Sequence, residues 1–303
     1  MRVSTEIDVD HVETIEDLHN EGIHLKDRTS VGSSIQSFGK SFRFYAKEDS
    51  EGFVNMPFIQ WRTFAPRIAF HEWKWMMNGM TDSKWLEDRK INIWKGNTSR
   101  EFLDSRGLQN LPEGDIGKSY GYQFRNFGGV DQLEETFNNL RDNPFSRRHV
   151  ISIWNVPELK EGALEPCAFL YTFMVSLDQD KNKVLNLHMN QRSADMIFGV
   201  PYNWAFASFW LVAFAKALGY KTGELFQTIT NVHYYSNQQP IVDYVVENYD
   251  EIIDHIDKME IPQIRIEKDL NSLDDVLNLE YSDIQMRNWK QGPKIHTDIQ
   301  MAV

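Results

Sequence analysis

Residues 183–219 read KVLNLHMNQRSADMIFGVPYNWAFASFWLVAFAKALG, and this stretch decides the fold class that we expect. From residue 183 to 191 apolar and polar side chains alternate, which is the period of a half-buried strand. From residue 201 to 218 the chain is apolar nearly all round, and Gly219 suits the end of a helix. The stretch therefore predicts a strand, a short polar segment and a helix buried at the centre of the fold.

Elements on both sides of this stretch predict an α+β fold. Further strands are expected over residues 148–154, 169–177 and 225–236, because these runs are rich in β-branched and aromatic residues. Helices are expected over 66–77 and over 240–259, where apolar residues recur near helical spacing. No linker divides the chain. We therefore expect a single domain over residues 1–303, with a large mixed sheet packed against the central helix.

Composition limits the classes of function. Apolar residues make up 41% of the chain and aromatic residues 13%, enough for a sizeable core. The net charge of −12 disfavours general binding to nucleic acid or to an anionic membrane. No apolar run is long enough to cross a membrane, and the start lacks a secretory signal. One cysteine cannot form an intrachain disulfide, so a cytoplasmic location is expected. The nine histidines show no metal-ligand spacing, so we expect no metal.

Three chemically useful groups arrive on consecutive predicted elements. Cys167 precedes the strand at 169–177, Arg192 follows the strand at 183–191 in a polar turn, and Asn203 stands near the start of the buried helix. A lone cysteine is often only a small buried side chain. Together with a cation and an amide, however, a thiol is typical of a site that binds an anionic heterocycle and attacks it covalently. Arg192 is the nearest candidate, by element order, for activating Cys167.

Other polar residues allow a structural and a functional interpretation. Asn203 could cap its helix, or its amide could match the imide edge of a pyrimidine such as uracil. His233 and Tyr235 alternate on one strand, and they could pack together or hold a sugar hydroxyl. Glu72 lies on an apolar helix, where a carboxylate is either exposed or perturbed. Four arginines, which could solvate a surface or bind one phosphate, are Arg28, Arg147, Arg148 and Arg192.

The order and spacing of many short motifs resemble the thymidylate synthase family along nearly the whole chain. These motifs are Asp27-Arg28-Thr29, His71-Glu72-Trp73-Lys74-Trp75, Asn78-Gly79, Ile93-Trp94, Gly114-Asp115-Ile116-Gly117, Tyr120-Gly121, Asn143-Pro144, Arg147-Arg148, Pro166-Cys167, Gln191-Arg192-Ser193, Asp195-Met196, Gly199-Val200-Pro201-Tyr202-Asn203, Val232-His233-Tyr234-Tyr235-Ser236-Asn237 and Met301-Ala302-Val303.

The resemblance implies a covalent reaction between two small molecules, a nucleotide and a folate. Cys167 would add to C6 of deoxyuridylate (dUMP), and C5 would then take the one-carbon unit of the co-substrate 5,10-methylenetetrahydrofolate, giving thymidylate (dTMP) and dihydrofolate. Glu72 would steer protons through ordered water, and Tyr120 would lie near the thiol when the C5 proton is lost. Water must be excluded until hydride reaches the exocyclic methylene.

The resemblance also implies which residues bind the ligands. Those for the nucleotide are Arg28, Gln191, Arg192, Ser193, Asp195, Asn203, His233 and Tyr235, with Asn203 reading the base. Those for the folate are Trp94, Asn97, Asp195 and Val303. Arg147 and Arg148 would reach the partner's phosphate site in a homodimer whose interface is the sheet.

Some positions depart from the family, and these departures leave alternatives open. Ala168 replaces the usual histidine after the nucleophile, Asn231 replaces an aspartate, Gln238 replaces a histidine, and residues 60–62 differ from Thr-Thr-Lys. Similar nucleotide hydroxymethylases let water capture the methylene, and Ala168 gives this alternative weight. Trp94 and the terminal motif Met301-Ala302-Val303 favour capture of the methylene by hydride. Cytidylate-specific relatives carry aspartate at the position of Asn203, which favours uracil. A weaker alternative is an inactive nucleotide-binding relative.

Overall fold

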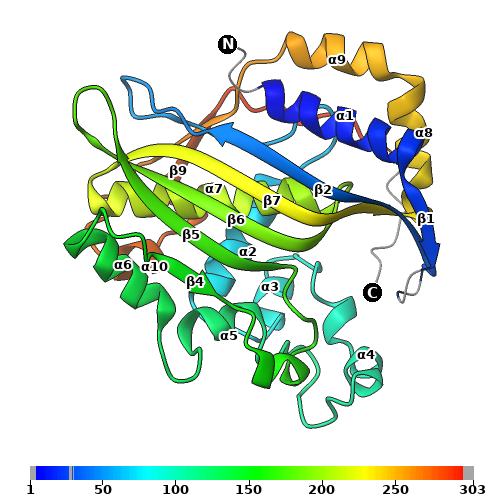
Figure 1. Cartoon of the computed structure of the whole chain (residues 1–303), viewed down its shortest axis with the longest axis horizontal. Helices are drawn as coiled ribbons and strands as arrows, with labels where there is room; N and C mark the ends of the chain where they lie inside the picture. Colours follow the sequence, from blue (N-terminus) through cyan, green and yellow to red (C-terminus); the bar gives the residue numbers. More distant parts are fainter. Residues whose placement is uncertain (1–4, 27–28, 30, 296–303) are drawn as a thin grey trace.

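The central strand and helix form as the sequence predicts. They are strand β6 (Lys183–Asp195) and helix α7 (Gly199–Leu218), shown in Figure 1. The computed structural model describes residues 5–26, 29 and 31–295. Helix α7 ends where Gly219 takes a φ of 67°, a left-handed conformation that glycine adopts without steric cost. Fourteen residues of α7 are buried, so nearly every face of the helix lies in the core.

A large mixed sheet confirms the predicted fold class. Its six strands follow the order β1-β2-β7-β6-β5-β4. Their bounds are β1 Ile23–Lys26, β2 Ser33–Tyr45, β4 Val150–Ser152, β5 Ala168–Leu177 and β7 Lys221–Tyr235. Strands β6 and β7 are parallel, and all the other neighbours in this sheet are antiparallel. Helix α7 supplies the crossover that a parallel pair needs. The carboxyl ends of β6 and β7 therefore lie side by side, close to the start of α7.

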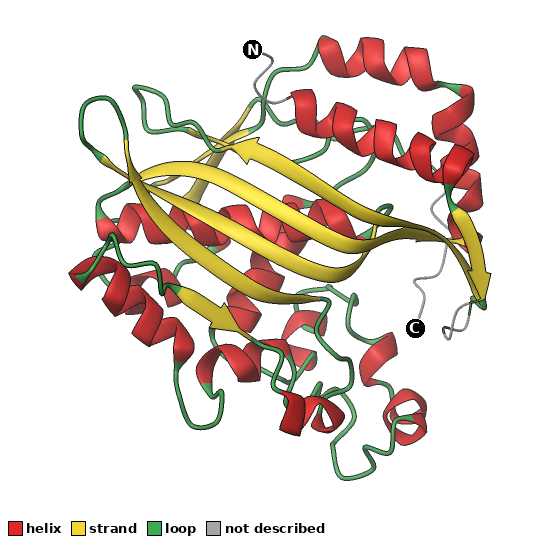
Figure 2. Cartoon of the chain, viewed as in Figure 1, coloured by secondary structure: helices red, strands yellow, loops and turns green. Residues whose placement is uncertain are grey.

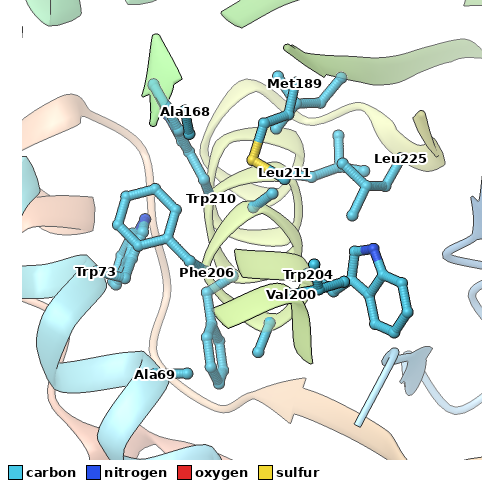
Figure 3. Packing of buried hydrophobic residues seen from close by; sticks show 14 of the residues in the cluster. Ala69, Trp73, Ala168, Met189, Val200, Trp204, Phe206, Trp210, Leu211 and Leu225 are labelled. Carbon is cyan, nitrogen blue, oxygen red and sulfur yellow. The ribbon is translucent and has the colours of Figure 1, made fainter. Parts of the chain in front are cut away.

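Helix α7 packs between the sheet and helix α2 (Pro66–Met77). Figure 3 shows Trp204 on the side of α7 near Leu225 of β7, and Trp73 of α2 on the opposite side. Trp210 is fully buried, and its ring centroid lies 5.0 Å from that of Tyr171 and 5.2 Å from that of Phe173 on β5. Edge and tilted aromatic contacts of this kind stabilise a core beyond the area they bury.

The opposite face of the central strands is uncovered in the described part of the chain. Figure 2 shows the helices behind or beside β5, β6 and β7, and none in front of them. Met174 is 57% exposed while its neighbours Phe173 and Val175 are buried, and Tyr45 is 41% exposed next to buried Phe44. Alternation places these exposed side chains on the open face. The sheet therefore presents apolar side chains to solvent in the single chain.

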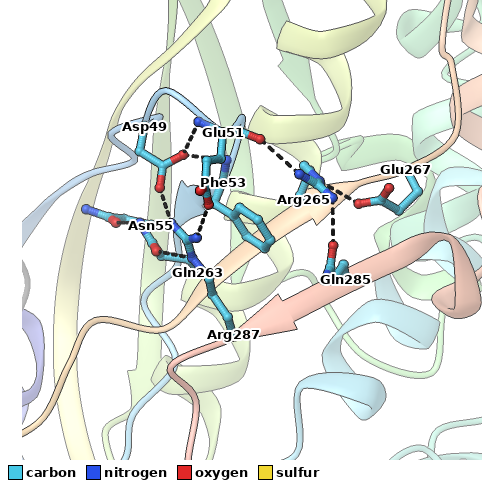
Figure 4. Close-up of polar contacts among 9 residues, drawn as sticks. All are labelled: Asp49, Glu51, Phe53, Asn55, Gln263, Arg265, Glu267, Gln285 and Arg287. Atoms are coloured by element: carbon cyan, nitrogen blue, oxygen red, sulfur yellow. Dashed lines mark hydrogen bonds and ion pairs between the residues drawn. The ribbon is translucent and has the colours of Figure 1, made fainter.

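A second, small sheet joins distant parts of the chain. It has the order β3-β8-β9, with β3 Val54–Asn55, β8 Gln263–Ile266 and β9 Ile284–Arg287. The guanidinium groups of Arg265 and Arg287 lie 4.7 and 3.9 Å from the ring centroid of Phe53. Figure 4 shows the carboxylates of Asp49 and Glu51 close to Arg287, with which both form ion pairs. These contacts fasten the C-terminal third to the loop after β2.

Smaller helices surround these two sheets. The α-helices not yet described are α1 Thr5–Glu21, α3 Lys84–Glu87, α4 Arg100–Ser105, α5 Tyr120–Arg125, α6 Gln132–Asp142, α8 Gln239–Glu247, α9 Tyr249–Asp257 and α10 Leu273–Leu277. The short 3-10 helices are η1 Gly96–Thr98, η2 Val156–Glu161, η3 Ser236–Gln238 and η4 Tyr281–Asp283. Within the residues described, the structure contains no helix both long and apolar enough to cross a bilayer.

Several elements differ from the sequence prediction. Strand β4 is shorter than the strand expected over 148–154, and β7 begins at Lys221, before the expected 225. Two differences are larger. The expected helix over 240–259 is two helices, because the backbone turns at Asn248 (φ −120°, ψ 23°) and the Asn248 side chain donates to the Tyr244 carbonyl at 2.8 Å. Strand β6 continues beyond Gln191 to Asp195, because its pairing with β7 continues through Ser193 and Asn231. The prediction of a polar turn at Arg192 was therefore wrong, and Arg192 lies on a strand.

Candidate active site

The free thiol of Cys167 lies at the start of β5, against a cation from the next strand. One guanidinium nitrogen of Arg192, Nη2, is 3.6 Å from the Cys167 sulfur. The Arg192 backbone N–H donates to the Cys167 carbonyl at 2.9 Å, which fixes the two strand ends together. Arg192 therefore places a positive charge directly beside the sulfur. Cys167 is a free cysteine and is partly exposed.

Backbone carbonyls hold the Arg192 guanidinium in place. Its Nε donates to the carbonyl of Pro166 at 3.0 Å, and Nη2 donates to the carbonyl of Glu165 at 2.9 Å. The group also lies 5.6 Å from the ring centroid of Trp154. Arginine binds planar acceptors through fixed donors, so anchoring it in this way fixes the direction of its charge.

A carboxyl, an indole and a phenol continue the site away from the thiol. Trp94 Nε1 donates to Glu72 Oε1 at 2.9 Å, and the Trp94 ring meets that of Tyr120 edge-on at 5.5 Å. The Tyr120 hydroxyl accepts a hydrogen bond from the Cys167 backbone N–H at 2.9 Å. Glu72, Trp94, Tyr120 and Cys167 thus form a continuous row, although they come from four separate segments.

Burial perturbs two groups of this row, Glu72 and Tyr120. Desolvation raises the pKa of Glu72 to about 7, although the hydrogen bond from Trp94 partly opposes the shift. Desolvation also raises the pKa of Tyr120, and the nearby Cys167 charge raises it further. A carboxyl with a pKa near neutral can both take up and release a proton at physiological pH. The raised pKa of Glu72 favours the second interpretation of its sequence position, a perturbed carboxyl.

Asn203 is held by its amide and does not cap the helix. Helix α7 begins at Gly199, four residues earlier, and Asp195 Oδ1 accepts from the backbone N–H groups of Ile197 and Phe198 at 2.8 and 3.2 Å. The capping interpretation of Asn203 was wrong. Gln191 Nε2 instead donates to Asn203 Oδ1 at 3.0 Å.

The ends of β6 and β7 bring together most of the remaining predicted residues. Ser193 Oγ and His233 Nδ1 are 3.4 Å apart, and the rings of His233 and Tyr235 meet edge-on at 4.9 Å. His233 and Tyr235 therefore share one side of the strand, as predicted. Gln238 Nε2 donates to the second carboxylate oxygen of Asp195 at 2.8 Å.

Other predicted residues lie apart from this cluster. Arg147 and Arg148 are exposed just before β4, and neither forms an ion pair with any described residue. Asn97 is partly exposed in η1, three residues after Trp94. Arg28 and Val303 lie outside the described residues. No group of three or more potential metal ligands occurs within the residues described.

Residues 60–62, where the chain departs from the family pattern, belong to a buried polar cluster that the sequence did not reveal. Trp61 Nε1 donates to His11 Nδ1 at 3.0 Å, and the Gln60 backbone N–H donates to Asp8 Oδ1 at 3.0 Å. Burial raises the pKa of Asp8 to about 7 and lowers the pKa of His11 to about 3. Arg62 donates to the Ile197 carbonyl. These residues anchor α1 against the core, next to the start of α7.

Gln227 and Trp204 are joined to this candidate site by hydrogen bonds, and the sequence analysis missed both. Gln227 Nε2 donates to Gln191 Oε1, and Trp204 Nε1 donates to Gln227 Oε1 at 2.7 Å. The sequence held one sign of Gln227: a glutamine stands between Leu225 and Ile229, at a position where the alternation of the strand predicts a buried, apolar residue.

The fold and these contacts define an α+β protein with a cysteine-centred site at the end of its sheet. Comparison with known families specifies it further: the model of the thymidylate synthase family matches residues 10–303, and the chain belongs to this family.

Individual relatives agree with this assignment. The chain is 36% identical over 240 residues to the bifunctional dihydrofolate reductase-thymidylate synthase of Leishmania major, covering 75% of this chain and 44% of that protein. It is 32% identical over 292 residues to the thymidylate synthase of Agaricus bisporus, covering 89% and 90%. It is 30% identical over 301 residues to that of Candida albicans, covering 91% and 92%. The chain thus spans less than half of the bifunctional relative and most of the other two.

Proposed function

We propose that the protein is a thymidylate synthase, which transfers the one-carbon unit of 5,10-methylenetetrahydrofolate to C5 of dUMP and releases dTMP and dihydrofolate. The observation that carries this proposal is the row of Glu72, Trp94, Tyr120 and Cys167 beside the guanidinium of Arg192. A protein that only binds nucleotides needs neither a thiol beside a cation nor a carboxyl with a raised pKa.

Cys167 begins the reaction as a thiolate that adds to C6 of the uracil ring, which makes C5 nucleophilic. Arg192 stabilises the thiolate and keeps donors for the phosphate. C5 then forms a bond to the methylene carbon and later loses its proton near the Tyr120 hydroxyl. Tetrahydrofolate leaves as an amine and then donates hydride to the remaining methylene. Finally the bond between Cys167 and C6 breaks, and the thiolate is regenerated.

Glu72 moves protons in this scheme, through water that connects its carboxyl to the substrate. Its pKa of about 7 lets it exchange a proton without a large energetic penalty at neutral pH. Trp94 holds one carboxyl oxygen, so the other is free to face the substrate. A folate would be contacted by Trp94, which is 8% exposed, and by the Asp195 carboxylate, which Gln238 orients and which can accept from pterin N–H groups.

Residues at the carboxyl ends of β6 and β7 would make the other contacts with the nucleotide. Ser193, with Arg192, would bind the phosphate, and His233 with Tyr235 would hold the 3′-hydroxyl. Asn203 would read the uracil edge with one donor and one acceptor. Arg28 would also bind the phosphate, and Asn97 and Val303 would contact the folate or close the site.

A homodimer would complete the phosphate site. The exposed apolar side chains on the open face of the sheet, such as Met174 and Tyr45, support burial of this face against a second copy. Arg147 and Arg148 are exposed and without ion-pair partners among the described residues, so they are free to reach the other subunit's phosphate. The dimer axis would make these contacts reciprocal.

This arrangement predicts rescue between inactive subunits. A Cys167→Ser protein mixed with an Arg147→Ala, Arg148→Ala double variant should regain about a quarter of wild-type activity, because random exchange gives one intact site in half of the dimers. A Cys167→Ser and Glu72→Gln mixture is the matched control: both residues belong to the same subunit's site, so no activity should return. Native mass spectrometry would verify exchange. Lack of rescue in exchanged dimers would contradict the shared site.

Deoxyuridylate hydroxymethylation is the second candidate, because Ala168 is only 4% exposed beside the nucleophile and offers no polar group to order water. In that reaction water, instead of hydride, captures the methylene. Incubation with dUMP and 5,10-methylenetetrahydrofolate should give a methyl product, and mass spectrometry separates it from a hydroxymethyl product by one oxygen atom. Formation of dihydrofolate, seen by its absorbance, should match the methyl product mole for mole. A hydroxymethyl product with tetrahydrofolate would instead support the second candidate.

A further inference from the structure

A line of buried side-chain hydrogen bonds runs from α7 through β7 and β6 and returns to α7. Trp204 Nε1 donates to Gln227 Oε1 at 2.7 Å, Gln227 Nε2 donates to Gln191 Oε1, and Gln191 Nε2 donates to Asn203 Oδ1 at 3.0 Å. Trp204, Gln227 and Gln191 are 1%, 0% and 3% exposed, so water cannot replace these bonds. The line ends on the amide that we propose reads the base. We call these four residues the amide relay.

The indole at the start gives the amide relay one direction. Each glutamine or asparagine amide could be turned over, because its oxygen and nitrogen ends have the same shape. An indole N–H, in contrast, can only donate. Gln227 must therefore turn its oxygen to Trp204 and its nitrogen to Gln191. Gln191 must in turn point its nitrogen to Asn203, so Asn203 turns its oxygen toward Gln191 and its own Nδ2 away from it.

The surroundings of Gln227 make the opposite direction costly. Gln227 lies on the core face of β7 between Leu225 and Ile229, and all three side chains are buried. Turning its amide over would set its NH₂ against the indole N–H and leave two buried donors without acceptors. An unsatisfied buried donor is strongly unfavourable. The amide relay therefore holds Asn203 in one orientation before any ligand arrives.

Uracil and cytosine need opposite orientations of such an amide. The uracil edge offers the O4 acceptor and the N3–H donor, which pair with Asn203 Nδ2 and with the second lone pair of Oδ1. The cytosine edge offers an amino donor and the N3 acceptor, so Asn203 would have to turn over. Its NH₂ would then face the NH₂ of Gln191, which is already fixed by the relay.

We propose that Trp204 and Gln227 are positioning residues that make the site select uracil over cytosine nucleotides by fixing the Asn203 amide. This inference rests on the proposed binding of dUMP. It assigns base specificity to two residues that contact neither the base nor the reacting atoms, and that act through Gln191.

The test compares binding of dUMP and of deoxycytidylate (dCMP) by calorimetry. Trp204→Phe keeps an aromatic ring against Phe42, whose centroid lies 5.0 Å away, but removes the N–H that sets the direction. The ratio of the dCMP to the dUMP dissociation constant should fall about tenfold. This factor corresponds to the free energy that leaving one buried polar group unsatisfied costs. This fall should come mainly from tighter dCMP binding. Gln227→Leu, which cuts the relay at the next residue, should shift the ratio in the same direction.

Trp210→Phe is the matched control. Trp210 is also a fully buried tryptophan of α7, but its indole nitrogen has no hydrogen-bond partner among the residues described, so the substitution removes an N–H outside the relay. Its nucleotide ratio should stay at the wild-type value. An unchanged ratio in both relay variants, with circular dichroism showing that they fold, would overturn the inference. If the wild-type protein binds neither nucleotide, the proposed function fails, and that outcome is distinct from selective wild-type binding with unchanged variants.

Discussion

Cys167→Ser should lower turnover by a factor on the order of 10⁴ or more, while dUMP still binds with nearly the wild-type affinity. The hydroxyl can keep a hydrogen bond to Arg192, so the shape of the site changes little. A serine hydroxyl, however, has a much higher pKa than a thiol, and the guanidinium cannot ionise it at neutral pH. The attack on C6 is therefore lost, and binding is not.

Two measurements check this expectation. Steady-state formation of dTMP gives the loss of turnover, and calorimetry gives the affinity for dUMP. With 5-fluoro-dUMP and methylenetetrahydrofolate the wild-type protein should form a stable covalent complex, and its mass should place the adduct on the one cysteine of the chain. Near-normal turnover by Cys167→Ser, or an adduct on another residue, would contradict the role of the thiol.

Glu72→Gln should lower kcat by about 10²–10⁴-fold, because the amide can neither take up nor release a proton. The substitution keeps an oxygen that accepts from Trp94 Nε1, so the position of the side chain is preserved. With a pKa of about 7, Glu72 should give the wild-type pH profile of kcat/KM a limb near pH 7. That limb should be missing from the residual activity of the variant.

The same substitution should stabilise the protein at high pH. The pKa of Glu72 is raised from 4.5 to about 7 in the folded state, so the unfolded chain loses this proton first as the pH rises. The contribution of Glu72 to stability therefore falls between pH 4.5 and 7. Glu72→Gln removes this loss. The variant should exceed the wild type by about 1–3 kcal/mol at pH 8 and match it near pH 4, as measured by urea unfolding.

This pair of effects distinguishes a catalytic carboxyl from a structural one. A residue that only supports packing would lose stability and activity together when it is substituted. Equal stability of the two proteins at pH 8, or activity within tenfold of wild type, would contradict a buried proton carrier at this position.

Local patterns in the sequence predicted the elements that are defined by neighbouring residues. The alternation before Gln191 and the apolar run after Pro201 gave β6 and α7, because burial on one face or on all faces leaves a periodic trace. The same patterns failed at Asn248, where one side-chain hydrogen bond to Tyr244 separates two helices that share an amphipathic pattern. They also failed at Arg192, because pairing with β7 decides where β6 ends.

The candidate site likewise contains residues that the sequence predicted and residues that it did not. Element order already suggested Arg192 as the cation nearest to Cys167, and the structure places its Nη2 3.6 Å from the sulfur. The amide relay could not be seen in this way, because Gln227 is 36 residues from Gln191 and 23 from Trp204. No local period connects such residues. Only the parallel register of β6 and β7 brings their amides into contact.

The order of strands in the large sheet has a consequence during translation. Strand β2 leaves the ribosome early, but its inner neighbour β7 is made much later: Ser34 pairs with Tyr235, about 200 residues further along the chain. The nascent chain must carry an unpaired edge through most of its synthesis, and such edges are prone to self-association. This topology favours slow, late closure of the sheet, and it makes chaperone protection of the emerging chain most valuable before residue 235 is made.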